Sequence, residues 1–308
     1  MDITAAVKDD HRRVIASLSP AERRKLTALS DGPGLLRLSV HGGLAAVLGV
    51  LIALQVPFWP LLLFPQGLLL AFLFTAEHEC IHGTGFRSRR LNQSVAFAAG
   101  LFLLLPPNWF RYFHFAHHRH TQDPEHDPEL MGPKPRTFRE YALYLSGVPY
   151  WTSLAKSLWA NALGRAEEPW VPPKGVDKVQ AEARAYLGIY AALIAASLLA
   201  GTTALLWACL VPVLLGQPFL RAFVLAEHAR CPMVADMLAN TRTTLTNVFV
   251  RWLSWNMPFH AEHHAYPAVP FHQLPPFHAV IRDRLRVVEP GYARFHARFA
   301  GGLERQER

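Results

Sequence analysis

The segment His114-Phe-Ala-His117-His118 is the most informative part of the sequence, because its pattern returns near the C-terminus as His260-Ala-Glu-His263-His264. Each stretch reads His-x-x-His-His. Residues three and four apart share one face of a helix, so each stretch is predicted to direct three imidazoles towards one point. A third stretch, His78-Glu-Cys-Ile-His82, sets two more histidines at the four-residue spacing. Histidine is the commonest metal ligand, and the three stretches therefore predict a metal protein.

The composition predicts a membrane protein with a substantial polar part. Of the 308 residues, 51% are hydrophobic and only 18% are charged, against about 25% in an ordinary soluble domain. Mean hydropathy is +0.12, the formal net charge is +8 and the pI is about 9.7. The basic residues crowd the ends of apolar segments, which favours cytoplasmic anchors facing anionic lipid over nucleic-acid binding. The three cysteines are scattered, which excludes a disulfide framework and a thiolate metal site.

Apolar stretches of sufficient length predict four transmembrane helices, at about residues 37–56, 61–82, 185–200 and 203–223. Short turns at Pro57-Phe-Trp-Pro60 and Gly201-Thr-Thr203 join them into two hairpins. Arg37 precedes the first hairpin, and Arg87, Arg89 and Arg90 follow it, so the positive-inside rule places both ends in the cytoplasm. The first 30 residues are polar, and no cleavable signal peptide is expected. Four spans in two hairpins put every histidine stretch on the same side of the membrane.

The remaining segments are predicted to form a cytoplasmic, histidine-rich helical cap from residues 83–184 and 224–308. Residues 91–105 are apolar but short, which is typical of a re-entrant or interfacial helix. Residues 138–163 mix aromatic side chains with Lys156 and predict one interfacial amphipathic helix. Residues 165–183 are interpreted as a polar linker. The fold class is thus an all-α membrane protein, with one domain covering residues 1–308.

The three histidine stretches, in this order and spacing, resemble the histidine boxes of the membrane fatty acid desaturase superfamily. The resemblance covers residues from about 35 to 278 and includes both hairpins. It implies a cytoplasm-facing centre of two iron ions (Fe2+/Fe3+) that uses O2 as co-substrate to attack an unactivated C–H bond. The family pattern implies one further histidine just after the fourth span, where His228 stands. The implied metal ligands, which are also the implied catalytic residues, are His78, His82, His114, His117, His118, His228, His260, His263 and His264.

The chemistry agrees with this ligand type. Removal of hydrogen from an alkyl chain needs a redox-active metal, and zinc has no redox chemistry. The resemblance therefore predicts an oxidoreductase that desaturates a lipid acyl chain. A hydroxylase or ketolase of the same superfamily, acting on a fatty acid, a carotenoid or a small amphiphile, is the alternative, because the boxes do not separate the two outcomes. The boxes also do not identify the substrate, the position of a new double bond or the iron that each histidine binds.

Two readings from other classes compete with the oxidase hypothesis. The first box also reads His-Glu-x-x-His, the pattern of zinc proteases in which the glutamate is the general base. That reading leaves the boxes at 114–118 and 260–264 without a role. A non-enzymatic receptor or adaptor would not require intact boxes. Neither hypothesis therefore accounts for all three boxes as an oxidase does.

Carboxylates beside the boxes are candidates for orienting the imidazole rings. They are Glu77, Glu79, Asp123, Asp127, Glu227 and Glu262, and Asn256 is a weaker candidate for holding a water. The other histidines are expected not to bind metal: His11, His41, His120, His126, His272, His278 and His296.

The expected partners are a lipid or acyl substrate, the membrane, and a separate electron donor protein of the ferredoxin or cytochrome b5 type. A basic face formed by Arg87, Arg89, Arg90, Arg242 and Arg251 would suit an acidic donor. The expected location is an integral, multi-pass membrane protein with its active site on the cytoplasmic side, in a bacterial inner membrane. Nucleic acid is not an expected partner.

Overall fold

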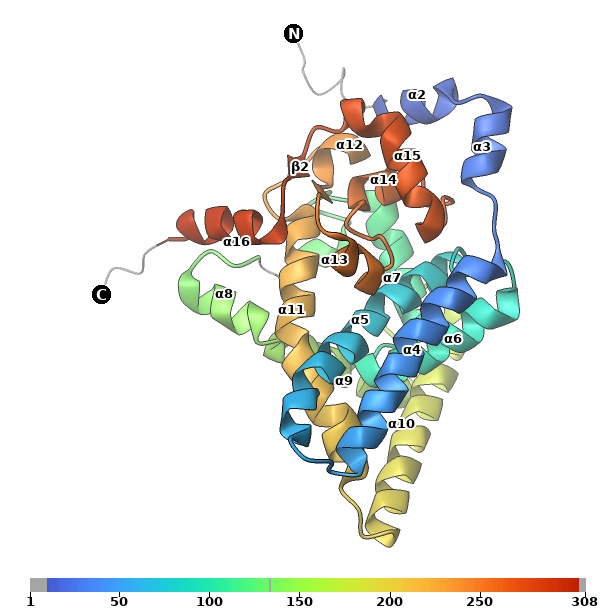
Figure 1. Cartoon of the computed structure of the whole chain (residues 1–308). Coiled ribbons are helices and arrows are strands. Elements are labelled where there is room, and N and C mark those ends of the chain that lie inside the picture. The colour runs from blue at the N-terminus through green and yellow to red at the C-terminus, as the bar shows by residue number, and fades with distance from the viewer. Residues whose placement is uncertain (1–9, 133, 305–308) are drawn as a thin grey trace.

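Four helices are long and apolar enough to cross a membrane in the computed structural model, which describes residues 10–132 and 134–304. They are α4 (Asp31–Ala53), α5 (Leu63–His82), α10 (Val176–Leu199) and α11 (Val211–His228). With the turns that adjoin them, the apolar segments are Pro20–Ala53, Trp59–His82, Pro173–Leu199 and Leu206–His228. All four lie in one half of the molecule (Figure 1). The four predicted spans are thus confirmed as apolar helices in a mostly helical protein.

Helices α5 and α11 form the packed centre of this half. Glycines allow their backbones to touch, since a Cβ atom added to Gly216 would lie 2.0 Å from the carbonyl oxygen of Gly67. Helix α4 covers α5 on one side and exposes large apolar side chains such as Leu36 and Val47 on the other. Helix α10 packs chiefly against α9 (Val148–Ala162). Exposed apolar faces on long helices are what contact with lipid requires.

Most of the other elements form a cap at one end of the four long helices, and the rest lie beside these helices or at their other end (Figure 1). A two-stranded parallel sheet pairs Thr243 with Val288 and Thr244 with Glu289. The cap and its approaches comprise α2 (Asp10–Ser17), α3 (Pro20–Leu26), α6 (Arg89–Leu103), α7 (Pro107–His120), α8 (Phe138–Leu145), α12 (Met237–Asn240), α13 (Val248–Leu253), α14 (His260–Ala265), α15 (Leu274–Ile281), α16 (Tyr292–Gly301), β1 (Thr243–Thr244) and β2 (Val288–Glu289). Short helical turns are η1 (Trp59–Leu62), η2 (Pro128–Leu130), η3 (Pro173–Gly175), η5 (Phe271–Gln273), η6 (Arg282–Arg284) and the π-helix η4 (Leu206–Leu210).

Two sequence-based predictions of local structure are wrong. Residues 138–163 do not form one helix, because Gly147 adopts a left-handed conformation (φ +74°) that separates α8 from α9. The predicted polar linker at 165–183 ends earlier, because α10 already begins at Val176. Its first turns are held by Glu182, whose carboxylate accepts hydrogen bonds from the backbone N–H (2.8 Å) and the side-chain amide (2.9 Å) of Asn108. Glu182 thus caps a neighbouring helix rather than facing water.

Candidate metal centre

Helix ends bring the predicted histidines together at the junction of the long helices and the cap. His78 and His82 occupy the last two turns of α5, and His228 is the last residue of α11. Pro107 starts α7 at the favoured first helical position, directly after Pro106 at the N-cap, and the second box lies in the final turns of this helix. The third box forms the short helix α14, in which all six residues are buried.

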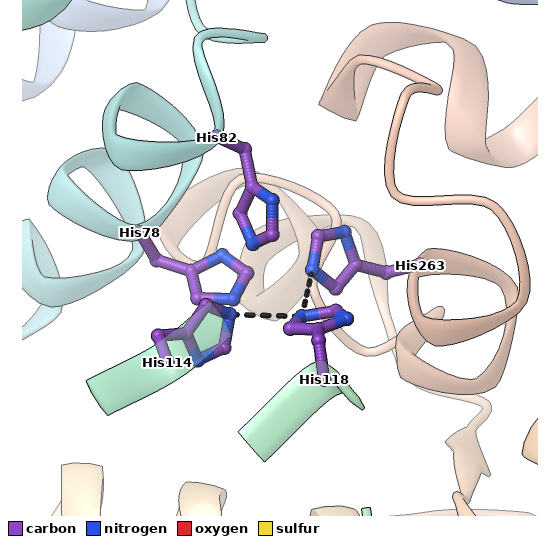
Figure 2. A group of neighbouring side chains, drawn as sticks. All are labelled: His78, His82, His114, His118 and His263. Carbon is purple, nitrogen blue, oxygen red and sulfur yellow. Dashed lines mark hydrogen bonds between the residues drawn. The ribbon is translucent and has the colours of Figure 1, made fainter. Parts of the chain in front are cut away.

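The nine histidines form two adjacent clusters. Cluster A has five members, whose candidate ligand nitrogens lie within 4.8 Å of one another: His78, His82, His114, His118 and His263. Figure 2 shows these rings turned towards a common space from α5, α7 and α14. Cluster B contains His117, His228 and His264, and His260 joins it through its Nε2 atom, 3.1 Å from Nε2 of His228. The clusters adjoin, because the rings of His118 and His264 stack with centroids 4.0 Å apart.

The structure corrects the expectation that each box directs three imidazoles at one point. In each His-x-x-His-His box the histidines four residues apart stay together, and the remaining one joins the other cluster. His114 and His118 belong to cluster A while His117 belongs to cluster B, and the third box divides in the opposite sense. The second and third boxes therefore each contribute to both clusters and link them, whereas both histidines of the first box belong to cluster A.

The donor atoms fit metal ions. Pairs of Nε2 atoms lie 2.9 Å apart in His114–His118, 3.1 Å in His118–His263 and 3.2 Å in His117–His228. Two nitrogens bound to one ion at about 2.1 Å and at a right angle would lie about 3.0 Å apart. Several buried ring nitrogens, including both of His78 and the Nε2 atoms of His82 and His264, lack a hydrogen-bond partner among the described residues. Unpartnered buried nitrogens at metal-ligand spacing are the donor set that an ion would satisfy.

Burial favours the neutral form of five histidines in the cap. It lowers the pKa of His114, His118, His260, His263 and His264 well below the usual value, and repulsion between the clustered rings adds to the effect. Neutral imidazole is the form that binds metals. Burial would also lower the pKa of His117, but the nearby carboxylates of Glu129 and Asp127 outweigh it and raise that pKa. Surroundings that favour a proton there would equally favour a metal cation.

Ring orientation in cluster B comes from hydrogen bonds to the nitrogens that face away from it. Nδ1 of His117 lies 2.9 Å from Oδ1 of Asp127, and Nδ1 of His264 lies 3.2 Å from the hydroxyl of Thr121. Nδ1 of His228 lies 3.4 Å from the carbonyl oxygen of Asn240. Such bonds fix which nitrogen faces the metal. Sequence reasoning identified Asp127 but missed Thr121 and the Asn240 carbonyl, since a hydroxyl or a backbone oxygen carries no pattern.

The other residues predicted to orient the imidazole rings make different kinds of contact. Glu227 lies 3.5 Å from His260 Nδ1, whereas Glu262 accepts a hydrogen bond from Thr243 (2.6 Å) and contacts His278. Asn256 donates to the carbonyl oxygen of Phe271 (2.9 Å), so its amide is engaged with backbone. Both carboxylate oxygens of Glu77 are buried without a hydrogen-bond partner among the described residues. His278, expected to be a packing or surface residue, instead connects α15 to α14 through Glu262.

Glu79 does not occupy the place of a protease general base. Its Oε2 atom accepts hydrogen bonds from the Thr84 hydroxyl (2.9 Å) and the Phe271 backbone N–H (3.1 Å), which tie α5 to η5. His78 and His82 meanwhile share their cluster with three further histidines. This arrangement is that of a multi-histidine centre and differs from the three-ligand site of a zinc protease.

Glu129 is a site residue that the sequence did not reveal. Its Oε1 atom lies 3.9 Å from Nε2 of His117, the nitrogen that faces His228. Burial alone would raise its pKa, but attraction to His117, Lys134 and other cations outweighs this and lowers the pKa to about 2. A negative charge therefore borders cluster B. The only signal in the sequence was proximity to the second box.

The remaining histidines lie outside both clusters. His120, Asp123 and His126 form an exposed group whose atoms are close enough to hold a cation, although Asp123 already pairs with His126 (3.0 Å). His11 contacts Asp236, His41 contacts the Leu69 carbonyl oxygen, and His296 contacts Tyr141. These contacts give the outlying histidines structural partners.

A family model described as fatty acid desaturase matches residues 45–296, which include all three boxes and His228. The chain belongs to the fatty acid desaturase family. A dihydrorhizobitoxine desaturase of Bradyrhizobium elkanii is 30% identical over 253 residues, covering 74% of this chain and 68% of that protein. With four apolar helices, this desaturase-family member is a membrane protein.

Shorter matches connect this desaturase-family chain to plant enzymes. A Delta(9) fatty acid conjugase-like enzyme of Dimorphotheca sinuata is 40% identical over 86 residues, 28% of this chain and 23% of that protein. A Delta(12) fatty acid desaturase of Calendula officinalis is 34% identical over 92 residues, 30% of this chain and 24% of that protein. The matched segments span about a quarter of the plant relatives' length.

Proposed function

We propose that this chain is an oxygen-dependent membrane oxidoreductase that desaturates a lipid acyl chain at a centre of two iron ions. The observation that carries the proposal is the pair of adjoining histidine clusters, A and B, at the inner ends of α5 and α11. Each cluster offers at least three buried imidazoles, and the rings of His118 and His264 stack where the two clusters meet. Family membership and the desaturase names of the relatives support the same reaction class.

Cluster A would hold one iron through His78, His82, His114, His118 and His263, and cluster B the other through His117, His228, His260 and His264. When bound, the irons would supply the activation of dioxygen and the oxidising power to remove hydrogen from an unactivated C–H bond. The chain's own residues hold these ligands in place. Asp127, Thr121 and the Asn240 carbonyl orient cluster B, while burial of the rings excludes water from the reaction.

Desaturation removes two hydrogens from the chain and reduces one O2 to two waters, so it requires two further electrons and two protons. We propose that a separate ferredoxin-like or cytochrome b5-like protein supplies the electrons. The exposed arginines Arg87, Arg89 and Arg90 offer an acidic donor a basic surface beside the end of α5. Arg242 is not part of that surface, because it is buried and donates to the carbonyl oxygens of Ala226 and Ala229.

Arg87, Arg89 and Arg90 also support the proposed position of the two clusters on the cytoplasmic side of the membrane. They follow α5 at the end that carries His82, whereas the turn between α4 and α5 at residues 54–58 carries no charge. By the positive-inside rule the clusters would face the cytoplasm, with α4–α5 and α10–α11 forming two hairpins of one domain over residues 1–308. A bacterial inner membrane is the proposed location.

The test combines metal analysis with lipid profiling. We expect protein purified in detergent to contain about two irons per chain, and a host that expresses it to accumulate acyl chains with a new double bond. A variant combining His263→Ala and His264→Ala should lose both the iron and the product. One zinc and no iron after anaerobic reconstitution with ferrous iron would refute the proposal. Replacing Arg87, Arg89 and Arg90 by glutamate should raise the donor's apparent KM in a salt-sensitive way.

A further inference from the structure

One carboxylate approaches cluster B from the side on which its imidazoles face one another. Oε1 of Glu129 lies 3.9 Å from Nε2 of His117, and the same nitrogen lies 3.2 Å from Nε2 of His228. Two ligand atoms that each lie about 2.1 Å from one metal ion can be at most about 4.2 Å apart. Glu129 is therefore within reach of an ion that His117 binds.

The other carboxylates near cluster B approach the opposite side of the rings. Asp127 lies 2.9 Å from Nδ1 of His117. Glu227 lies 3.5 Å from Nδ1 of His260, whose Nε2 atom faces the rest of the cluster. A carboxylate at the far nitrogen orients a ring from behind. Glu129 instead contacts the nitrogen that faces the metal position, which is where a ligand lies.

The carboxylate of Glu129 has no hydrogen-bond donor among the described residues. The nearest basic nitrogens belong to His117 and Lys134, each at 3.9 Å, which is too long for a hydrogen bond. The side chain is only 21% exposed, and a largely buried charge without close partners is unfavourable. Burial would raise the pKa of Glu129, but attraction to these and other cations lowers it to about 2, so the group is charged at neutral pH. A bound metal ion would supply the missing partner.

The local backbone holds Glu129 beside His117. Glu129 lies in the turn η2, directly after Pro128, whose ring restricts the backbone. Its backbone N–H donates to Oδ1 of Asp127 (2.9 Å), the same oxygen that contacts His117. One side chain thus positions both the ring of His117 and the backbone of Glu129.

The two clusters also differ by one imidazole, because cluster A contains five histidines and cluster B contains four. A carboxylate from Glu129 would give cluster B the same number of donors as cluster A. It would also offset one unit of positive charge, which the neutral imidazoles of cluster A do not. A negative ligand favours the more highly charged state of an ion, so the iron in cluster B would be the easier of the two to oxidise.

We propose that Glu129 binds the metal ion of cluster B through Oε1, as a fifth donor beside His117, His228, His260 and His264. The inference rests on the proposed two-iron centre and adds one carboxylate to a ligand set that the sequence predicted to contain only histidines.

The experiment records Mössbauer spectra of the full-length protein in detergent, reconstituted anaerobically with an excess of isotope-enriched ferrous iron. His264→Ala identifies the cluster B signal, because this variant should lose it. Glu129→Gln, which removes the charge and keeps the size, should shift that signal, leave the cluster A signal unchanged and lose its cluster B iron to a chelator at least about 10-fold more readily. Glu125→Gln, at an exposed position in the same loop, is the matched control and should change neither signal.

Glu129→Asp separates a ligand from a carboxylate that acts only through its charge. Aspartate keeps the charge but is shorter by one methylene, which withdraws the oxygen by roughly 1.5 Å. This variant should therefore resemble Glu129→Gln. A wild-type spectrum and iron affinity in Glu129→Asp would overturn the assignment, and so would an unchanged cluster B signal in Glu129→Gln.

Two further outcomes distinguish this inference from the claims beside it. Loss of both iron signals in Glu129→Gln, with a lower Tm of the metal-free protein, would mean that Glu129 supports the fold, and would refute its role as a ligand of one ion. A wild type that binds two irons but forms no unsaturated acyl chains would refute the proposed reaction, whereas the spectra of the variants would still decide the role of Glu129.

Discussion

Oδ1 of Asp127 lies 2.9 Å from Nδ1 of His117, and this contact turns the Nε2 atom of His117 towards His228. The same carboxylate accepts the backbone N–H groups of Gln122 and Glu129, so one side chain shapes the loop and orients a ring. Outer partners of metal-binding histidines typically change metal affinity by about 10-fold to 100-fold when removed. The orientation of His117 in cluster B therefore depends on Asp127, which is not itself a proposed metal ligand.

We predict that Asp127→Ala weakens iron binding at cluster B by about 10-fold to 100-fold while cluster A retains its ion. Iron per chain, measured by elemental mass spectrometry after dialysis against a chelator, should fall from about two towards one. Asp123→Asn is the matched control, because Asp123 lies in the same loop but contacts His120, His126 and the backbone N–H of Glu125 rather than a histidine of either cluster. Two tightly held irons in Asp127→Ala would contradict the positioning role.

Alanine at His78, His82, His117, His118, His263 or His264 is predicted to abolish activity and lower bound iron. The division of the third box adds a sharper expectation, since His263 belongs to cluster A and His264 to cluster B. Mössbauer spectra of the two single variants should therefore lose different iron signals. His126→Ala, whose side chain is 58% exposed, should keep both signals, and His11→Ala or His296→Ala should leave turnover within a few-fold. Loss of the same signal in both box variants would disprove the division.

The close approach of α5 and α11 is predicted to tolerate no added methyl group. Gly216→Ala would place a Cβ atom 2.0 Å from the Gly67 carbonyl oxygen, so the helices that carry His78 and His228 must separate. Such overpacking typically destabilises a protein by about 1–3 kcal/mol. We expect a lower Tm and less bound iron.

Gly188→Ala on α10 is the matched control for that substitution, because no atom lies within 4 Å of an added Cβ there. Alanine is also the better helix former, so this variant should be as stable as the wild type or slightly more stable. If Gly216→Ala unfolds at the same temperature as Gly188→Ala, the two long helices do not pack as described.

The sequence alone predicted the features that depend on the spacing of histidines and on the length of apolar segments. Apolar runs of about 20 residues predicted the four long helices, and the three boxes, together with His228 from the family resemblance, predicted nine histidines that the fold does bring together. The division of the second and third boxes between two clusters was not predictable, because it depends on how α5, α7, α11 and α14 are placed around the site. Thr121, Glu129 and His278 were missed for a related reason, since their roles come from contacts across the fold.

A final prediction concerns the pH dependence of the cap. Burial alone would raise the pKa of Asp236, but hydrogen bonds from His11 and the Leu238 N–H outweigh it and hold the pKa below the usual value. A carboxylate whose pKa is lowered on folding stabilises the protein above its unfolded pKa of about 3.9, and this stabilisation is lost as the pH falls through the folded pKa. Asp236→Asn keeps a good cap for α12 while removing the charge.

We therefore expect Asp236→Asn to unfold at a lower temperature than the wild type at pH 7, and the difference in Tm to shrink as the pH is lowered from 5 to 3. Comparing the two proteins at each pH removes the effect of metal loss that both share. Asp283→Asn is the control, because that side chain is 92% exposed and its substitution should change Tm little at any pH. A difference between wild type and Asp236→Asn that stays constant down to pH 3 would mean that the hydrogen bonds of the carboxylate, rather than its charge, anchor α2 to α12.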